Sequence, residues 1–171
     1  MLNKKMVNAF NRQINAELFS SYLYLSMAGH FKDSGLDGFA NWMEVQAKEE
    51  LFHGMKFYAE INERGGRVAL AAIEAPEDKW ASPLAAFEAV YAHEQKVTAL
   101  IGGLVELAQK EKDHAAQVFL QWFVTEQVEE EANAKALVDQ LRLVGDNPQG
   151  LFMIDRELRA RTFVMPVPAA G

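Results

Sequence analysis

Four carboxylates stand in the middle of apolar stretches of this sequence, where they could bind metal ions. Glu17, Glu50, Glu94 and Glu130 each have a large apolar or aromatic residue seven positions before and seven positions after them. An ionised side chain in a packed interior costs several kcal/mol unless it is paired or coordinates an ion. Four glutamates carry four negative charges, which two divalent cations would neutralise. These residues therefore indicate a two-metal site.

His53 supplies a nitrogen ligand beside these acids. It follows Glu50 by three positions, so both side chains lie on one face of a helix and can bind the same ion. Gln127 and Glu130 repeat that spacing later in the chain. Carboxylate-rich sites with one imidazole suit iron or manganese better than zinc or calcium. We expect iron(II).

Each of these signals also has an ordinary structural explanation. A Glu-x-x-His spacing occurs by chance in many helices, Glu94 beside His93 is typical of a solvated face, and the acids at 129–131 are typical of surface charge. The coincidence of four acids in similar surroundings favours the metal site. Tyr24, two turns from Glu17, is either aromatic core or a donor of a hydrogen bond or an electron to the site.

The remaining histidines have no partner at ligand spacing, and we expect them on the surface: His30, His93 and His114. Trp122 lies just off an apolar stripe, which favours a packing role.

Four long amphipathic helices are needed to position these residues. Apolar residues recur every three or four positions over about 5–32, 36–62, 83–110 and 114–144. Ser82-Pro83 and Asp113 are signals for helix starts, and Gly65-Gly66 and Gly145 for helix ends. Asn147-Pro148 starts a shorter fifth helix.

The links between these helices set the topology. Two links are short and predict antiparallel pairs, whereas residues 64–81 are enough to cross the length of a bundle as extended chain. The prediction is an all-α, up-down-down-up four-helix bundle with a long crossover between helices 2 and 3 and a short fifth C-terminal helix. We expect one domain over residues 1–163 and a flexible tail over 164–171.

Composition limits the class of protein. The 171 residues contain no cysteine, which excludes disulfides, thiolate zinc sites and iron–sulfur centres. No apolar run resembles a signal peptide or reaches the roughly 18 residues of a membrane span, so we expect a soluble, cytoplasmic protein that binds no membrane. A net charge of -7 argues against general nucleic-acid binding.

Taken together, the motifs resemble those of the bacterial non-haem ferritins over nearly the whole chain. The motifs are Asn15-Ala16-Glu17, Glu49-Glu50-Leu51-Phe52-His53, His93-Glu94-Gln95 and the segment from Trp122 to Glu130. The resemblance implies a ferritin-like bundle with one iron at Glu17, Glu50 and His53. It implies a second iron at Glu50, Glu94 and Glu130, bridged by Glu50, with Gln127 beside them. It further implies a third iron position at Glu49, Glu126 and Glu129, with Glu130 shared.

The same resemblance implies a function. It implies a hollow shell of 24 identical subunits that oxidises Fe(II) with dioxygen or hydrogen peroxide and stores ferric mineral inside. Relatives with a permanent di-iron cofactor have a second Glu-x-x-His where this chain has Gln127 and Glu130, so we expect iron to pass through the site. Haem-binding relatives have methionine where Leu51 stands, so we expect no haem. Arg156, Arg159 and Arg161 would line the fourfold contacts of the shell or be solvated.

Two other functions fit less well. A di-iron peroxidase or oxidase of the rubrerythrin kind would commonly carry a cysteine-ligated iron domain, which this sequence lacks. A purely structural bundle would leave four buried carboxylates unpaired.

Overall fold

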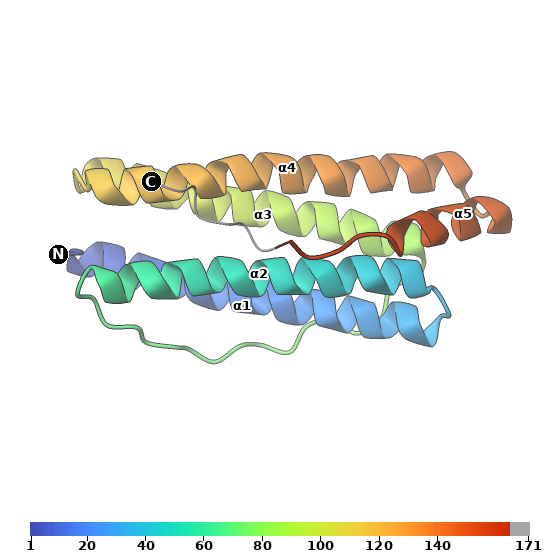
Figure 1. The fold of residues 1–171 in the computed structure, drawn as a ribbon, viewed down its shortest axis with the longest axis horizontal. Helices are drawn as coiled ribbons and strands as arrows, with labels where there is room; N and C mark the ends of the chain where they lie inside the picture. The colour runs from blue at the N-terminus through green and yellow to red at the C-terminus, as the bar shows by residue number, and fades with distance from the viewer. Residues whose placement is uncertain (165–171) are drawn as a thin grey trace.

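The computed structural model describes residues 1–164 as five helices (Figure 1). The long helices are α1 (Lys4–Asp33), α2 (Asp37–Glu63), α3 (Pro83–Lys110) and α4 (His114–Val144), and α5 (Pro148–Leu158) is short. Two antiparallel pairs, α1 with α2 and α3 with α4, form the bundle, which confirms the predicted fold class. Of the predicted tail, residues 165–171 lie outside the described part. None of the helices in residues 1–164 is long and apolar enough to cross a membrane.

The predicted capping residues start the helices. The Ser82 hydroxyl accepts a hydrogen bond from the Ala85 N–H at 3.1 Å, and the Asp113 carboxylate accepts one from the Ala116 N–H at 3.0 Å. Gly145, at the end of α4, has a φ of 54°, which favours glycine because it has no Cβ. Local sequence therefore determines these helix ends.

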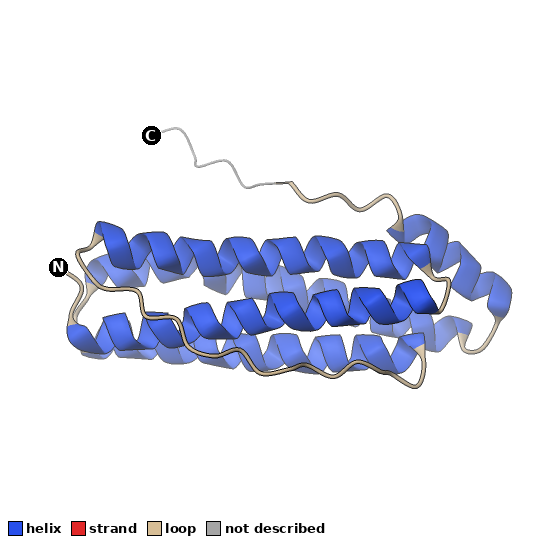
Figure 2. Ribbon diagram, turned by 90° about the horizontal axis from the view of Figure 1, so that it is seen from below, coloured by secondary structure: helices blue, strands red, loops and turns tan. Residues whose placement is uncertain are grey.

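The crossover runs along the outside of the bundle beside α1 (Figures 1 and 2). Three polar residues of α1 hydrogen-bond to the backbone of the crossover. The Asn11 side chain donates to the carbonyl of residue 67 and accepts from the N–H of residue 69. The Asn15 amide donates to the carbonyl of residue 72, and the Ser26 hydroxyl donates to the carbonyl of residue 77. These contacts replace the strand or helix partners that an extended segment lacks. The crossover makes α3 run parallel to α2, as predicted.

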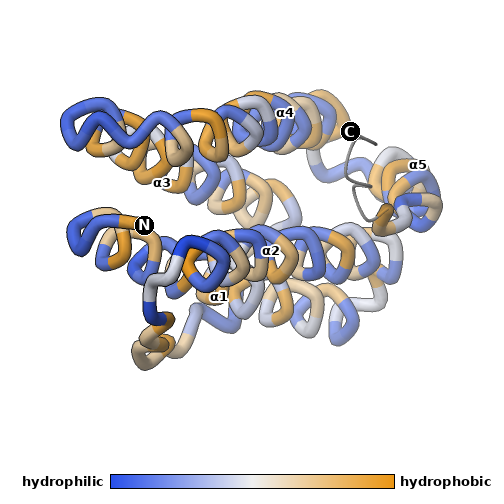
Figure 3. Tube along the Cα trace, turned by 60° about the vertical axis from the view of Figure 1, so that its left-hand side comes forward, coloured by the Kyte–Doolittle hydropathy of each residue, from blue (hydrophilic) through white to orange (hydrophobic). Residues whose placement is uncertain are grey.

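A polar layer divides the core into two apolar clusters. One cluster is built around Phe31, Phe39 and Phe87, and the other around Phe10, Phe57 and Phe123. In Figure 3 each long helix alternates between hydrophobic and hydrophilic residues along its length. The layer between the clusters contains these buried or nearly buried residues: Glu17, Ser20, Glu50, His53, Glu94, Gln127 and Glu130.

Helix α5 docks by capping α2. Leu36, the residue before α2, provides no side-chain cap, and the buried Asp155 carboxylate of α5 instead accepts from the N–H groups of Gly38 at 2.7 Å and Phe39 at 3.2 Å. A Cβ on Gly38 would lie 1.6 Å from the carbonyl oxygen of Asp155. Only glycine therefore allows this approach.

Replacing Gly38 by Ala should destabilise the protein by about 1–3 kcal/mol, because α5 must move away and the cap is lost. Thermal unfolding measures the change. Gly102→Ala in α3 is the matched control, since its new Cβ would meet nothing within 4 Å and alanine favours helix by about 1 kcal/mol. Equal unfolding temperatures for the two variants would contradict this account of α5.

Candidate metal centre

The structure brings the predicted ligands together at the middle of the bundle. Glu17, Glu50 and His53 offer ligand atoms that all lie within 4.8 Å of one another. Glu50, Glu94 and Glu130 form a second set with the same property. Each long helix contributes at least one of these residues, and Glu50 belongs to both sets. This geometry suits two metal ions that share one carboxylate.

Each set contains oxygen atoms that the protein leaves without a partner. The Oε2 atoms of Glu17, Glu50 and Glu130 are buried and accept no hydrogen bond. Buried polar atoms without a partner are rare and costly in folded proteins. Three such atoms in one cluster are available to coordinate cations, so the residues fit metal binding.

Neutral side chains orient the other carboxylate oxygens. The Gln13 amide donates to Glu17 at 2.8 Å, and the Gln46 amide donates to Glu50 at 3.2 Å and to Glu130 at 3.3 Å. These donors fix the direction of each carboxylate without adding a positive charge that would compete with a metal.

Glu94 is held from two sides. The Tyr24 hydroxyl donates a hydrogen bond to one of its oxygens, and the Gln127 amide lies 3.4 Å from the other. The same amide also donates to the hydroxyl of Thr98 at 3.2 Å. Tyr24 therefore contacts the site as a hydrogen-bond donor, one of the two predicted roles.

Burial and mutual repulsion govern the protonation of the acids. Burial raises the pKa of Glu17 and Glu94. Burial raises the pKa of Glu50 and Glu130 well above the usual range, and repulsion from neighbouring glutamates adds to it. A bound cation would reverse this effect, because it stabilises the ionised form.

His53 faces the acids from α2. Burial lowers its pKa, although Glu17 partly opposes the shift. Its Nδ1 atom lies 3.5 Å from Glu50 and 3.9 Å from Glu130. Trp122 and Phe123 pack edge-to-face against the imidazole, with ring centroids 5.3 and 5.9 Å from its own. Trp122 therefore has the predicted packing role. The ring is thereby held with a nitrogen toward the cluster.

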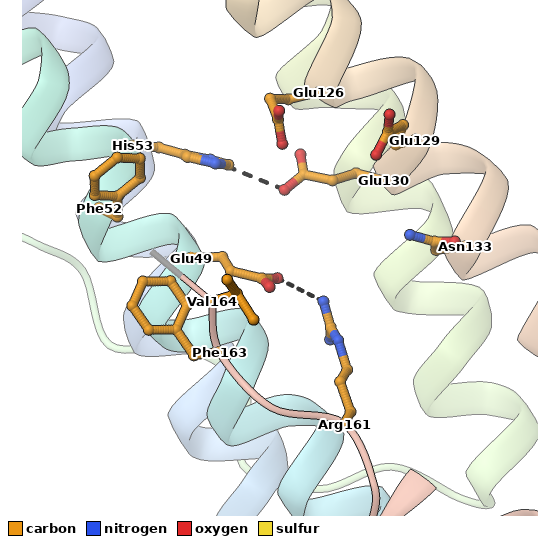
Figure 4. Close-up of a pocket in the computed structure, with 10 residues that line it drawn as sticks. All are labelled: Glu49, Phe52, His53, Glu126, Glu129, Glu130, Asn133, Arg161, Phe163 and Val164. Atoms are coloured by element: carbon orange, nitrogen blue, oxygen red, sulfur yellow. Dashed lines mark hydrogen bonds and ion pairs between the residues drawn. The ribbon is translucent and has the colours of Figure 1, made fainter. Parts of the chain in front are cut away.

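The residues of the predicted third position line an adjoining cavity of about 130 Å³ (Figure 4). Glu49 enters it from α2, and Glu126, Glu129 and Glu130 enter it from α4. Burial raises the pKa of Glu49 and Glu126. Among residues 1–164, these acids do not form a set within 4.8 Å like the two above. Their carboxylate oxygens line the cavity but lie too far apart to contact one ion together.

The expectation of surface positions is wrong for two of the three histidines, His93 and His30. His93 is partly buried, and its Nε2 atom lies 2.8 Å from the Ser20 hydroxyl. Burial, with a smaller effect of Lys96, lowers its pKa to about 4. His114 is exposed as expected, and His30 lies partly buried against Trp80.

Gln13 and Gln46 had not been assigned a role at the site from the sequence, and Arg161 had been expected at the fourfold contacts of the shell or in solvent. Gln13 and Gln46 stand four positions before Glu17 and Glu50, and this shared spacing was a usable signal. Arg161 reaches Glu49 from beyond α5, across 112 positions of sequence. No local pattern indicates that contact.

Comparisons with known proteins agree with this geometry. A family model for the ferritin-like domain matches residues 7–144. The bacterial non-haem ferritin of Staphylococcus saprophyticus is 44% identical over 163 residues, covering 95% of this chain and 98% of that protein. That of Bacteroides fragilis is 45% identical over 161 residues, covering 94% of this chain and all of that protein.

Solved structures are similar as well. An engineered closed form of the Archaeoglobus fulgidus ferritin superposes with a TM-score of 0.95 at 56% identity, covering 96% of this chain and 100% of that one. The open-pore ferritin of the same archaeon gives a TM-score of 0.93 at 56% identity, covering 95% of this chain and 100% of that one.

Replacing Glu130 by Gln should stabilise the metal-free protein by about 1–3 kcal/mol at neutral pH, because glutamine cannot ionise and folding then has neither to bury a charge nor to take up a proton at this position. The pKa of Glu130 is raised in the folded state, so its favourable contribution is complete below the unfolded value of 4.5 and is lost as the pH rises through the folded-state value. The variant should therefore lose less stability than wild type as pH rises from acid to neutral.

Unfolding of chelator-treated protein across this pH range measures the effect. Glu106→Gln, at an exposed position of α3, is the control and should change nothing. A Glu130→Gln protein that is less stable than wild type at neutral pH would contradict the electrostatic account.

Proposed function

The chain belongs to the ferritin family, and from that premise we propose that its buried carboxylate–histidine cluster is the di-iron ferroxidase centre. The protein oxidises Fe(II) and stores iron. The observation that carries the site assignment is the group of three buried carboxylate oxygens without hydrogen-bond partners. A peroxidase of the rubrerythrin kind is not favoured, because the near full-length relatives are ferritins.

Two ligand sets define the roles of the residues. Glu17, Glu50 and His53 bind the first iron, and Glu50, Glu94 and Glu130 bind the second. Glu50 bridges them, which the membership of Glu50 in both close sets supports. Two ions held side by side can each give one electron to the same oxidant, dioxygen or hydrogen peroxide.

Tyr24 and Gln127 position the ligands. Burial raises the pKa of Tyr24 well above its ordinary value, with Glu94 adding to the effect, so its hydroxyl keeps its proton and donates to Glu94. Gln127 lies beside Glu94 and brings no negative charge. With Gln127 and Glu130 in place of a second Glu-x-x-His, the pair of irons lacks one bridging carboxylate and one imidazole. We infer that oxidised iron leaves toward the store.

Glu49, Glu126 and Glu129, with Glu130, form a third iron position next to the pair. The support is the acidic cavity that these side chains line. An ion entering it would draw the carboxylates together. Because the cavity lies beside Glu130, iron could pass through it into or out of the di-iron centre.

We further propose that the chain assembles into a shell of 24 subunits in the cytoplasm and binds no haem. Exposed large apolar side chains on the α1–α2 pair support assembly: Tyr22 and Leu25 on α1, and Leu51, Met55 and Tyr58 on α2, are each 41–52% exposed. Contiguous exposed apolar residues commonly mark contacts with another chain. A second copy of this chain is the expected partner.

Replacing Glu50 by Ala should slow the initial oxidation of Fe(II) at least about tenfold, because both irons lose a ligand. Ultraviolet absorbance of the ferric product after rapid mixing with aerobic Fe(II) measures the rate. Glu106→Ala is the matched control and should oxidise iron at the wild-type rate. An unchanged rate in an assembled Glu50→Ala protein would rule out this cluster as the ferroxidase centre.

The native particle should have a mass of about 460 kDa, which is 24 copies of the 19.2 kDa chain. Mass photometry of purified protein measures it directly. A protein that is a stable monomer or dimer in this measurement would contradict the proposed shell.

A further inference from the structure

Arg161 places a positive charge at the edge of the acidic cavity. Its guanidinium donates to Glu49 Oε2 at 2.5 Å and to Gln46 Oε1 at 2.8 Å. Figure 4 shows this side chain reaching toward Glu49 from the segment that follows α5. The side chain is 23% exposed. It is therefore part of the cavity wall and not a solvated residue.

The segment that carries Arg161 is fixed to α2. The Asn41 amide donates to the carbonyls of Leu158 at 3.0 Å and Arg161 at 2.9 Å. The guanidinium also donates to the Trp42 carbonyl at 3.1 Å and lies 4.5 Å from the centre of the Trp42 ring. These contacts hold the charge in one place and favour it energetically.

Arg161 carries the one lysine or arginine charge among the described residues that line this cavity. Four glutamates share the same walls. A cation held next to Glu49 neutralises part of that charge, as a metal ion would. The guanidinium and an incoming ion therefore require the same carboxylate.

Gln46 links Arg161 to the di-iron centre. Its carbonyl oxygen accepts from Arg161, and its amide nitrogen donates to Glu50 at 3.2 Å and Glu130 at 3.3 Å. Accepting from Arg161 fixes which way this amide points. Arg161 thus donates directly to Glu49 of the third position, and its hydrogen-bonded link to the ligands Glu50 and Glu130 runs through Gln46.

We propose that Arg161 is an internal cation that competes with the third iron for Glu49 and so keeps binding at that position weak. The proposal rests on the proposed function, because it assigns a determinant of affinity to that site. An ion entering the cavity must displace the guanidinium from Glu49. Weak binding there favours passage of iron over retention.

Anaerobic titration of the assembled, iron-free protein with Fe(II), followed by calorimetry, tests the proposal. Arg161→Gln should lower the Kd for the third Fe(II) bound per subunit about tenfold or more. The Kd values for the first two Fe(II) ions should change by less than about threefold. If wild type binds only two equivalents measurably, a third should become measurable in the variant. Arg156→Gln, an exposed change of the same charge in α5, should match wild type.

Arg161→Lys separates charge from packing. Lysine keeps the positive charge, so its third equivalent should bind more weakly than in Arg161→Gln. Equal third-site affinities in wild type and Arg161→Gln would overturn the proposal, as would identical behaviour of the Lys and Gln variants. Failure of wild type to bind two equivalents would instead overturn the proposed function and the inference with it.

Discussion

Burial of four carboxylates in one layer of the bundle is the constraint on which the rest of the structure depends. Glu17, Glu50, Glu94 and Glu130 lie between two apolar clusters, where charge is expensive. The protein relieves only part of this cost, because three carboxylate oxygens keep no partner. In the proposed function, bound cations would offset this cost.

The surrounding polar residues follow from that constraint. Gln13, Gln46 and Gln127 are neutral donors, so they orient carboxylates without occupying the place of a cation. A lysine at any of these positions would permanently neutralise one of the negative charges that a cation would otherwise meet. The positive charge of Arg161 stands instead at the edge, where its direct hydrogen bond is to Glu49 of the third position and its link to the centre runs through Gln46.

The sequence predicts what local chemistry determines. Helix ends followed from Ser82, Asp113 and Gly145, and the meeting of the four glutamates followed from their middle position in each apolar stripe. The docking of α5 could not be predicted, since Asp155 caps a helix start 117 positions away. His93 was misjudged because its partner, Ser20, lies on another helix. Arg161 was missed for the same reason, as its contacts depend on how the chain returns after α5.

Anomalous diffraction at the iron edge, from crystals soaked with Fe(II) without oxygen, tests the central claim most directly. The account predicts two strong peaks in each subunit, one among Glu17, Glu50 and His53 and one among Glu50, Glu94 and Glu130. A cluster that stays empty at saturating Fe(II), or glutamates that turn outward to solvent, would contradict it.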